Sequence, residues 1–161
     1  MELVKIKDMY DFISFLPILL YIYGFLELVI NNNSYLFIGL VICSITHRLI
    51  KQITKNWNPN IFKRPDNARD TNGLNSGGFS GNNPGFPSGH TLATSYVMFY
   101  LIFTSNKYIF EIDNLLKIII VLLVAYARVM KGAHRVIQVI AGFLLGIIIA
   151  YIAAYKIKEI E

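Results

Sequence analysis

Long apolar runs, separated by short polar segments, dominate the chain. Residues 12–26 are uncharged and, together with 28–30, form a run long enough to cross a hydrocarbon core of about 30 Å. Later apolar runs cover 35–46, 91–105, 115–127 and 136–155. The run at 35–46 reaches residue 53 if Arg48 and Lys51 extend their charges to the interface. The pattern predicts an all-α, multi-pass transmembrane helical bundle of about five spans.

Lys5 and Lys7 precede the first run, as basic residues do in cleaved signal peptides. The run is long for a signal peptide and no small-residue cleavage site follows it, so we expect it to remain as a span. Residues 1–54 are interpreted as an N-terminal transmembrane hairpin, and 55–161, with loop 55–86 and three further spans, as the core of one integrated domain. The last span contains Gly142 and Gly146, a spacing typical of close helix packing.

The composition supports a membrane protein. Of 161 residues, 55% are hydrophobic and only 16% are charged, which excludes an ordinary soluble domain and confines disorder to one loop at most. The net charge of +5 does not indicate nucleic-acid binding, because the basic residues cluster at the ends of apolar runs. That placement suits lipid headgroups, phosphate ligands or orientation signals. The single cysteine, Cys43, excludes an intrachain disulfide and is interpreted as packing.

Residues 55–86 differ in character, with many Asn, Gly, Pro and Asp residues. We expect a long loop outside the membrane core, with Trp57 and Phe62 as interfacial anchors. Loops of this length are usually functional or disordered, and the Gly- and Asn-rich part at 72–84 fits either description. Five spans bring this loop, the N-terminus and the 128–135 turn to one face, so the candidate chemistry gathers on one side of the membrane.

A first candidate motif consists of Pro87, Ser88, Gly89 and His90, directly before the third span. Pro and Ser suit the first positions of a helix, whose free N–H groups attract an anion. Gly89 allows close approach of the backbone, and His90 adds a proton donor or acceptor near neutral pH. A capped helix start with an interfacial histidine explains the same four residues.

A second candidate motif, Arg128 and His134, lies at the turn between the fourth and fifth spans. An arginine at the end of an apolar helix is costly unless it is paired or interfacial, and its guanidinium matches phosphate oxygens. His134 is a candidate nucleophile. With Lys131 and Arg135, these residues also fit a basic turn that only orients the protein.

Together with Lys55, Arg64 and Pro65 at the start of the loop, these motifs resemble the type 2 phosphatidic acid phosphatase superfamily of membrane lipid phosphatases. The family pattern is a lysine followed by Arg-Pro, then Pro-Ser-Gly-His, then Ser-Arg, five residues, His, three residues and Asp. The order of the motifs and their position at a membrane edge both match, over residues 55–155.

The chain departs from this pattern at four points. Lys55 lies two residues too far from Arg64, so either an insertion is assumed or Lys63 takes the place of the lysine. Ala127 replaces the usual serine, and Gln138 replaces the usual aspartate. The chain has one predicted span fewer than the six of the family.

The resemblance implies a mechanism and a set of site residues. His134 attacks phosphorus to give a phosphohistidine, His90 protonates the leaving group and later activates water, and Gln138 orients the imidazole from four residues along the helix. The implied phosphate ligands are Lys55, Arg64, Ser88, Gly89 and Arg128. No metal or other cofactor is expected. We leave His47 outside the site, because a structural role better fits a histidine within an apolar run.

We therefore expect an integral membrane lipid phosphate or lipid pyrophosphate phosphatase, a metal-independent phosphohydrolase with a lipid phosphate substrate in the bilayer and no nucleic-acid partner. No oligomeric state is predicted. The alternative is a catalytically impaired relative that binds phospholipid headgroups or scaffolds a membrane complex, because Gln138 removes a negative charge beside His134. Restoring aspartate at position 138 is expected to raise turnover at least about tenfold.

The charge distribution and the family resemblance favour opposite orientations of the site in the membrane. Most of the fifteen lysines and arginines lie on the motif face, which favours a cytoplasmic site by the positive-inside rule. The resemblance favours the extracytoplasmic or luminal face. We adopt the second, because charges in long loops count less and a phosphate site needs cations wherever it faces.

Overall fold

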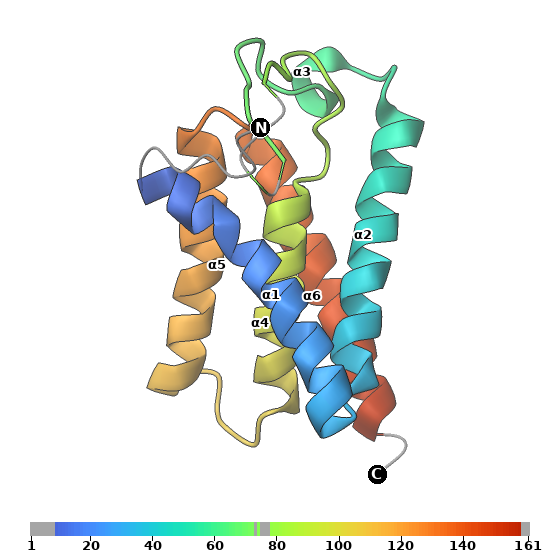
Figure 1. Cartoon of the computed structure of the whole chain (residues 1–161), viewed down its shortest axis with the longest axis vertical. Coiled ribbons are helices and arrows are strands. Elements are labelled where there is room, and N and C mark those ends of the chain that lie inside the picture. The colour runs from blue at the N-terminus through green and yellow to red at the C-terminus, as the bar shows by residue number, and fades with distance from the viewer. Residues whose placement is uncertain (1–8, 73, 75–77, 159–161) are drawn as a thin grey trace.

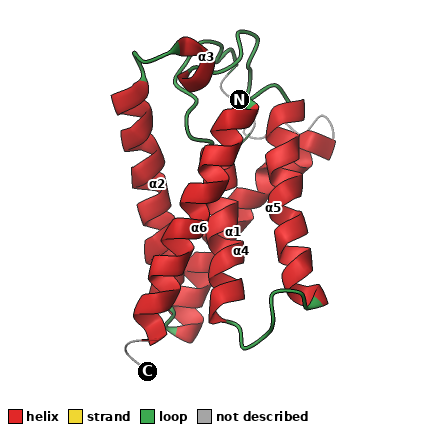
Figure 2. Ribbon diagram, turned by 180° about the vertical axis from the view of Figure 1, so that it is seen from behind, coloured by secondary structure: helices red, strands yellow, loops and turns green. Residues whose placement is uncertain are grey.

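The computed structural model describes residues 9–72, 74 and 78–158. Five long helices run between the two ends of an elongated bundle, and a short helix lies in the loop at one end (Figure 1, Figure 2). The elements are α1 (Met9–Asn31), α2 (Ser34–Thr54), α3 (Pro59–Phe62), α4 (Gly89–Thr104), α5 (Ile112–Met130) and α6 (Val136–Lys158). The predicted all-α, multi-pass bundle is confirmed, and each predicted span corresponds to one long helix.

Three of the described helices, α1, α2 and α6, are long and apolar enough to cross a membrane by length and composition. Helix α4 has 16 residues, and at 1.5 Å per residue it extends only about 24 Å. Helix α5 carries Asp113 and Lys117 in its first turns and Arg128 in its last. Both still run alongside the longer helices (Figure 1). Helix α4 is therefore too short, and α5 too charged, to meet the length and composition that the other three meet.

The outward faces of the long helices are hydrophobic. The large exposed side chains recur every three or four residues, as Ile38, Ile42, Ile45 and Leu49 on α2 and as Ile137, Ile140, Leu144 and Ile148 on α6. This spacing marks a single face of each helix. Exposed apolar surface of such extent is typical of a protein surrounded by lipid.

Helix α4 lies at the centre of the bundle, and every residue from 91 to 100 is buried. It packs against α1, α2, α5 and most extensively α6. A β-carbon at Gly142 would lie 2.5 Å from the carbonyl oxygen of Ser88, and one at Gly146 would lie 2.6 Å from that of Leu92. The two glycines thus let α6 approach α4 closely, as the sequence predicts. The division of the chain near residue 54 stays a prediction.

The long loop closes one end of the bundle. The backbone N–H of Arg64 donates to the carbonyl oxygen of Asn83 at 2.9 Å, which joins the two halves of the loop. The rings of Phe62 and Phe86 meet edge to face with their centroids 4.9 Å apart. Part of the Gly- and Asn-rich segment, residues 73 and 75–77, lies outside the described residues. The part of the loop that carries Arg64 is thereby held against the segment that leads into α4.

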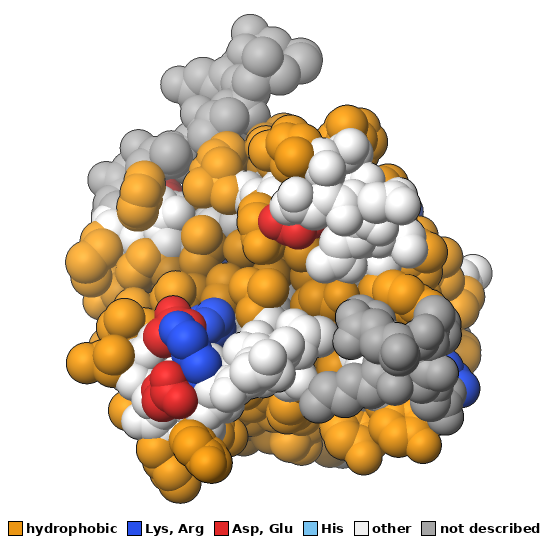
Figure 3. Space-filling view, turned by 90° about the horizontal axis from the view of Figure 1, so that it is seen from below, with side chains coloured by type: hydrophobic (Ala, Val, Ile, Leu, Met, Phe, Trp, Pro, Cys, Tyr) orange, Lys and Arg blue, Asp and Glu red, His pale blue; other side chains and the backbone are white. Residues whose placement is uncertain are grey.

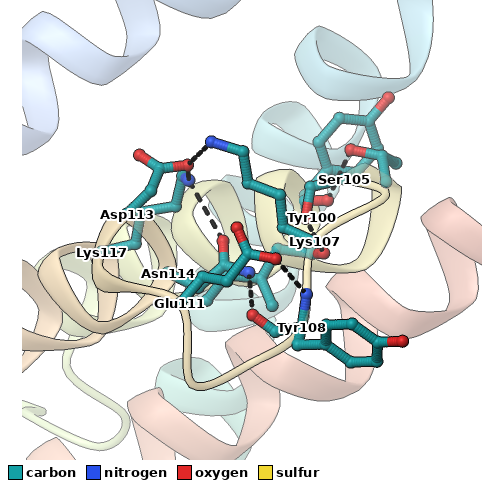
Figure 4. A network of polar contacts seen from close by, with 10 residues as sticks. Tyr100, Ser105, Lys107, Tyr108, Glu111, Asp113, Asn114 and Lys117 are labelled. Carbon is teal, nitrogen blue, oxygen red and sulfur yellow. Dashed lines mark hydrogen bonds and ion pairs between the residues drawn. The ribbon is translucent and has the colours of Figure 1, made fainter.

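The opposite end of the bundle carries the connection from α4 to α5 (Figure 4). The side chain of Asn114 donates to the carbonyl oxygen of Tyr108 at 3.0 Å, and Glu111 accepts the N–H of Tyr108 at 3.0 Å. Lys117 and Asp113 form an ion pair at 2.6 Å. Seen from this end, the surface is largely hydrophobic or uncharged. Basic and acidic side chains adjoin in one area, and further charged side chains lie apart from it (Figure 3). The candidate motifs all lie at the other end.

Candidate active site

A cavity of about 540 Å³ lies between α1, α2 and α4, at the end of the bundle that carries the long loop. Pro17, Ile18 and Tyr21 of α1 supply an apolar wall. Cations and histidines supply the polar wall, namely His47, Arg48, Lys51, Arg64, His90 and His134. No carboxylate is found among the described residues that line the cavity. The cavity is therefore suited to an anion that carries an apolar group.

His134 lies in the turn that joins α5 to α6. Gly132 has a φ of +68°, a conformation that favours glycine. The N–H groups of Ala133 and His134 both donate to the carbonyl oxygen of Arg128, at 3.1 and 3.2 Å. This tight turn places the imidazole in the cavity wall, where 2% of the residue is exposed.

Two contacts define the tautomer of His134. Its Nδ1 lies 3.1 Å from Oε1 of Gln138, and its Nε2 lies 3.1 Å from a terminal nitrogen of Arg64. A guanidinium can only donate, so Nε2 accepts from Arg64 and Nδ1 carries the proton. The lone pair that can attack an electrophile is therefore on Nε2.

The amide of Gln138 is fixed by its own contacts. Its nitrogen donates to the carbonyl oxygens of Ile61 at 2.9 Å and Lys63 at 2.8 Å, and its oxygen accepts from His134 and from the N–H of Arg135 at 3.2 Å. Because carbonyl oxygens only accept, the amide nitrogen must face the loop and the amide oxygen must face the imidazole. Gln138 thus orients His134 and connects it to the long loop.

Arg64 reaches the site from the long loop and also donates to the carbonyl oxygen of Ala133 at 2.7 Å. Burial lowers the pKa of Arg64 to about 10, so the guanidinium stays charged at neutral pH. Burial, and then the charges of Arg64, Arg128 and Lys51, hold the pKa of His134 well below its ordinary value. The imidazole is consequently neutral near pH 7, which is the nucleophilic form.

Arg128 and His90 bring buried polar atoms to the same region. One terminal nitrogen of the fully buried Arg128 donates to the carbonyl oxygen of Thr71 at 2.8 Å. Its Nε and other terminal nitrogen, and Nε2 of His90, are buried and have no hydrogen-bond partner among the described residues. Leaving such groups unsatisfied costs about 1–3 kcal/mol each, and more for charged groups. The simplest group to satisfy a guanidinium here is an anion rich in acceptor oxygens.

The remaining predicted phosphate ligands differ in their placement. Gly89 lines the cavity at the start of α4. Ser88 caps that helix, and its hydroxyl accepts from the hydroxyl of Thr91 at 3.1 Å and from its N–H at 3.5 Å. Lys55 directly follows α2, is exposed and lies outside the cavity lining. Phosphate binding by these three residues, and by Arg64 and Arg128, stays a prediction.

Three basic residues of α2 that line the cavity, His47, Arg48 and Lys51, were missed by the sequence interpretation. His47, which we left outside the site, and Lys51 both line the cavity from α2. They lie four residues apart, so they share one helix face, and Ser44 and Arg48 line the cavity from the same face. The available signal was this polar face within an otherwise apolar run.

Comparison with known proteins accords with this geometry. A sequence model described as the PAP2 superfamily, the type 2 phosphatidic acid phosphatases, matches residues 33–160. The chain belongs to the PAP2 superfamily. The family suggested by the motifs is therefore confirmed, and with the apolar helices it identifies an integral membrane protein. The PAP2 match begins just before α2, so α1 lies outside it.

One PAP2 relative is a protein named undecaprenyl-diphosphatase, from Sulfolobus acidocaldarius. It is 40% identical to this chain over 81 residues. The match covers 47% of this chain and 37% of that protein, so the chain spans little more than a third of the relative. No solved structure matches the chain.

Proposed function

We propose that this PAP2 protein is an integral membrane phosphatase of lipid phosphates or lipid pyrophosphates that acts through a phosphohistidine. The observation that carries the proposal is the set of buried atoms of Arg128 and His90 that lack partners among the described residues, in the region where His134 holds its lone pair on Nε2. Similarity to a protein named undecaprenyl-diphosphatase supports a lipid pyrophosphate as one substrate.

The first step transfers a phosphoryl group to the enzyme. Nε2 of His134 forms a bond to phosphorus while the bond from phosphorus to the lipid oxygen breaks. That oxygen leaves with the electron pair and takes a proton from His90. The guanidinium groups of Arg64 and Arg128 stabilise the negative charge on the three phosphoryl oxygens. The amide oxygen of Gln138 accepts a hydrogen bond from Nδ1–H and so keeps the imidazole aligned.

The second step releases phosphate. His90 takes a proton from water, and the water oxygen attacks phosphorus. The bond from phosphorus to Nε2 breaks and its electron pair returns to His134. Inorganic phosphate leaves, and because the proton taken from water replaces the one that His90 gave to the leaving group, the enzyme is back in its starting protonation state.

We assign the lysine of the family pattern to Lys51 rather than Lys55. Lys51 lines the cavity together with Arg64, whereas Lys55, one turn later, is exposed and outside the lining. An ammonium at the cavity wall can bind a phosphoryl oxygen as a point charge. The apolar wall formed by α1 leaves the lipid chain on the bilayer side of the same cavity.

Release of inorganic phosphate by detergent-purified protein tests the proposal. The unaltered chain should hydrolyse a lipid phosphate or lipid diphosphate, and His134→Ala should reduce turnover by roughly 10³-fold or more because the nucleophile is lost. Lys107→Gln, at the opposite end of the bundle, serves as the control and should retain activity. Lipid binding without turnover in the unaltered protein would instead favour the impaired, headgroup-binding relative that Gln138 suggests.

A further inference from the structure

Helix α2 presents basic side chains to the cavity at two levels. The helix ends at Thr54 beside the long loop, so Lys51 lies nearest that loop (Figure 1). His47 and Arg48 lie about one turn, or roughly 5 Å, farther into the bundle, and both line the cavity. The proposed mechanism uses Lys51 and leaves the deeper pair without a role.

The ring of His47 is held in place from two sides. Its Nδ1 lies 3.1 Å from the carbonyl oxygen of Cys43, which only accepts, so Nδ1 carries a proton. Nε2 donates to a phosphate oxygen when the ring is the doubly protonated imidazolium, the form that an adjacent anion favours. On its other side the ring lies against Gly89, where an added β-carbon would be 3.2 Å from Nε2. The ring is therefore fixed beside the first turn of α4, next to His90. All three histidines of the chain line this one cavity.

The charge of the cavity exceeds what one phosphate requires. Arg64 contacts Nε2 of His134, Lys51 lines the same cavity, and the buried Arg128 also acts on His134 electrostatically. Arg48 adds another cation at the deeper level, and no carboxylate lines the described part of the wall to offset it. Below this level, Ser44 and Tyr21 join α2 to α1 through a hydroxyl–hydroxyl hydrogen bond of 2.5 Å.

We propose that His47 and Arg48 bind the lipid-proximal phosphate of a lipid diphosphate, while the cations nearer the loop hold the terminal phosphate. The proposal rests on the proposed function and narrows its substrate class. His134 then bonds to the terminal phosphorus, and the bond from that phosphorus to the bridging oxygen breaks. The bridging oxygen leaves with the electron pair as part of a lipid monophosphate.

The two candidate substrates place different demands on the deeper pair. A lipid diphosphate releases a phosphate anion, whose charge Arg48 and His47 stabilise where it develops. A lipid monophosphate releases an alcohol, which has no second phosphate to occupy this level. The deeper pair should therefore matter for the diphosphate alone.

The test compares farnesyl diphosphate with farnesyl monophosphate in detergent micelles. Arg48→Gln and His47→Gln should each lower kcat/KM for the diphosphate by about 10- to 100-fold, as expected for the loss of a charge-assisted hydrogen bond. The same variants should change kcat/KM for the monophosphate by less than about threefold, which also shows that they are folded. Lys107→Gln, which removes a positive charge at the opposite end, should alter neither value.

An equal decrease for both substrates, or no decrease for the diphosphate, would overturn the proposed subsite. Competition binding gives a second measurement that does not depend on turnover. Inorganic pyrophosphate should bind the unaltered protein more tightly than inorganic phosphate, and Arg48→Gln should remove that preference. If neither farnesyl substrate is hydrolysed but the preference is present and depends on Arg48, the phosphatase proposal fails and the subsite stands. If no preference is found, the subsite fails.

Discussion

Gln138 stands where the PAP2 pattern has an aspartate, and its contacts show what the amide contributes. Its hydrogens donate to the carbonyl oxygens of Ile61 and Lys63, while its oxygen orients His134. A carboxylate could orient the imidazole but has no hydrogen to donate to the loop. From the sequence the amide looks like a lost charge, and we expected aspartate to raise turnover. The contacts favour the opposite outcome.

We predict that Gln138→Asp shifts the acid limb of the kcat/KM profile to higher pH without raising turnover. Burial and nearby cations hold the pKa of His134 well below its ordinary value, so the nucleophile stays neutral down to low pH. A carboxylate at position 138 favours the charged imidazole and raises that pKa, so activity is lost at a higher pH as the solution is acidified.

Gln138→Asn is the matched control for this prediction, because it shortens the side chain equally and adds no charge. Both variants should lose stability by about 1–3 kcal/mol for each carbonyl left unsatisfied. Only the aspartate variant should move the acid limb. An unchanged limb, or turnover above that of the unaltered protein, would show that another group controls the imidazole.

We predict that Lys51→Gln reduces kcat/KM for a lipid phosphate by about 10- to 100-fold, because an ammonium that contacts phosphoryl oxygens is lost. Lys55→Gln should change it by less than about threefold, since Lys55 is exposed and outside the cavity lining. Phosphate release measured side by side for the two variants checks this. A larger decrease in kcat/KM for Lys55→Gln than for Lys51→Gln would favour Lys55, the lysine that the sequence suggested.

Lys51 and Lys55 show why spacing along the chain was a poor guide to the lysine that binds phosphate. Helix α2 continues to Thr54, which places Lys51 in its last turns and Lys55 just beyond its end. Which of two lysines faces inward depends on the rotation of the helix about its axis. That rotation is set by packing against α4 and α1, which the sequence pattern does not reveal.

At the scale of elements, α1 lies outside the PAP2 match but supports the active-site end of the bundle. Asp11 in its first turn forms an ion pair with Lys131, 2.5 Å apart, just after α5. The two side chains are only 9% and 12% exposed. Burial lowers the pKa of Lys131, and the hydrogen bond that its ammonium donates to Asp11 partly offsets that effect. The pair thus connects α1 to the turn that carries His134.

We predict that Asp11→Asn lowers the free energy of unfolding by about 3 kcal/mol, because a buried ammonium is left without its counter-ion. Thermal unfolding in detergent measures the change. Lys107→Gln removes a partner from an ion pair whose side chains are about half exposed, and it should cost less than about 1 kcal/mol. Equal effects from the two substitutions would rule out a special contribution of the Asp11 pair.

At the scale of the whole molecule, hydrophobic periodicity predicted the helices well, because lipid on the outside and side chains on the inside leave few polar positions within a span. The motifs predicted His90, Arg128 and His134 because three ordered patterns reinforce one another. His47 was missed for the converse reason. A lone histidine in an apolar run carries no pattern, and only the packing of α2 on α4 brings it to the cavity.

We predict that activity persists in excess EDTA and that vanadate inhibits competitively. The lining residues supply guanidinium, ammonium and imidazole groups, and the described part of the cavity wall has no carboxylates of the kind that Mg²⁺ prefers. Vanadate resembles the five-coordinate phosphorus that these cations would stabilise. Phosphate release measured with and without chelator checks this, and activity that falls on chelation and returns with a divalent cation would contradict it.

We predict that the site faces the extracytoplasmic or luminal side, as the resemblance implies. Asn67→Cys, exposed in the long loop, should react with a membrane-impermeant maleimide applied to sealed, right-side-out vesicles. Tyr108→Cys, 83% exposed at the opposite end, should react only after the membrane is permeabilised. The native Cys43 is 1% exposed and should not contribute. The reverse pattern of labelling would place the site in the cytoplasm.

The close contact between α4 and α6 limits how this protein can be made more robust. Replacing a helical glycine by alanine commonly stabilises a helix by about 1 kcal/mol, which makes it a standard route in protein engineering. At Gly142 and Gly146 that methyl group would meet the backbone of α4. The resulting displacement of α6 would move Gln138 and His134 relative to α4, which carries His90. Stabilising substitutions must therefore be sought on the lipid-facing sides of the helices, where a side chain can change without moving the nucleophile.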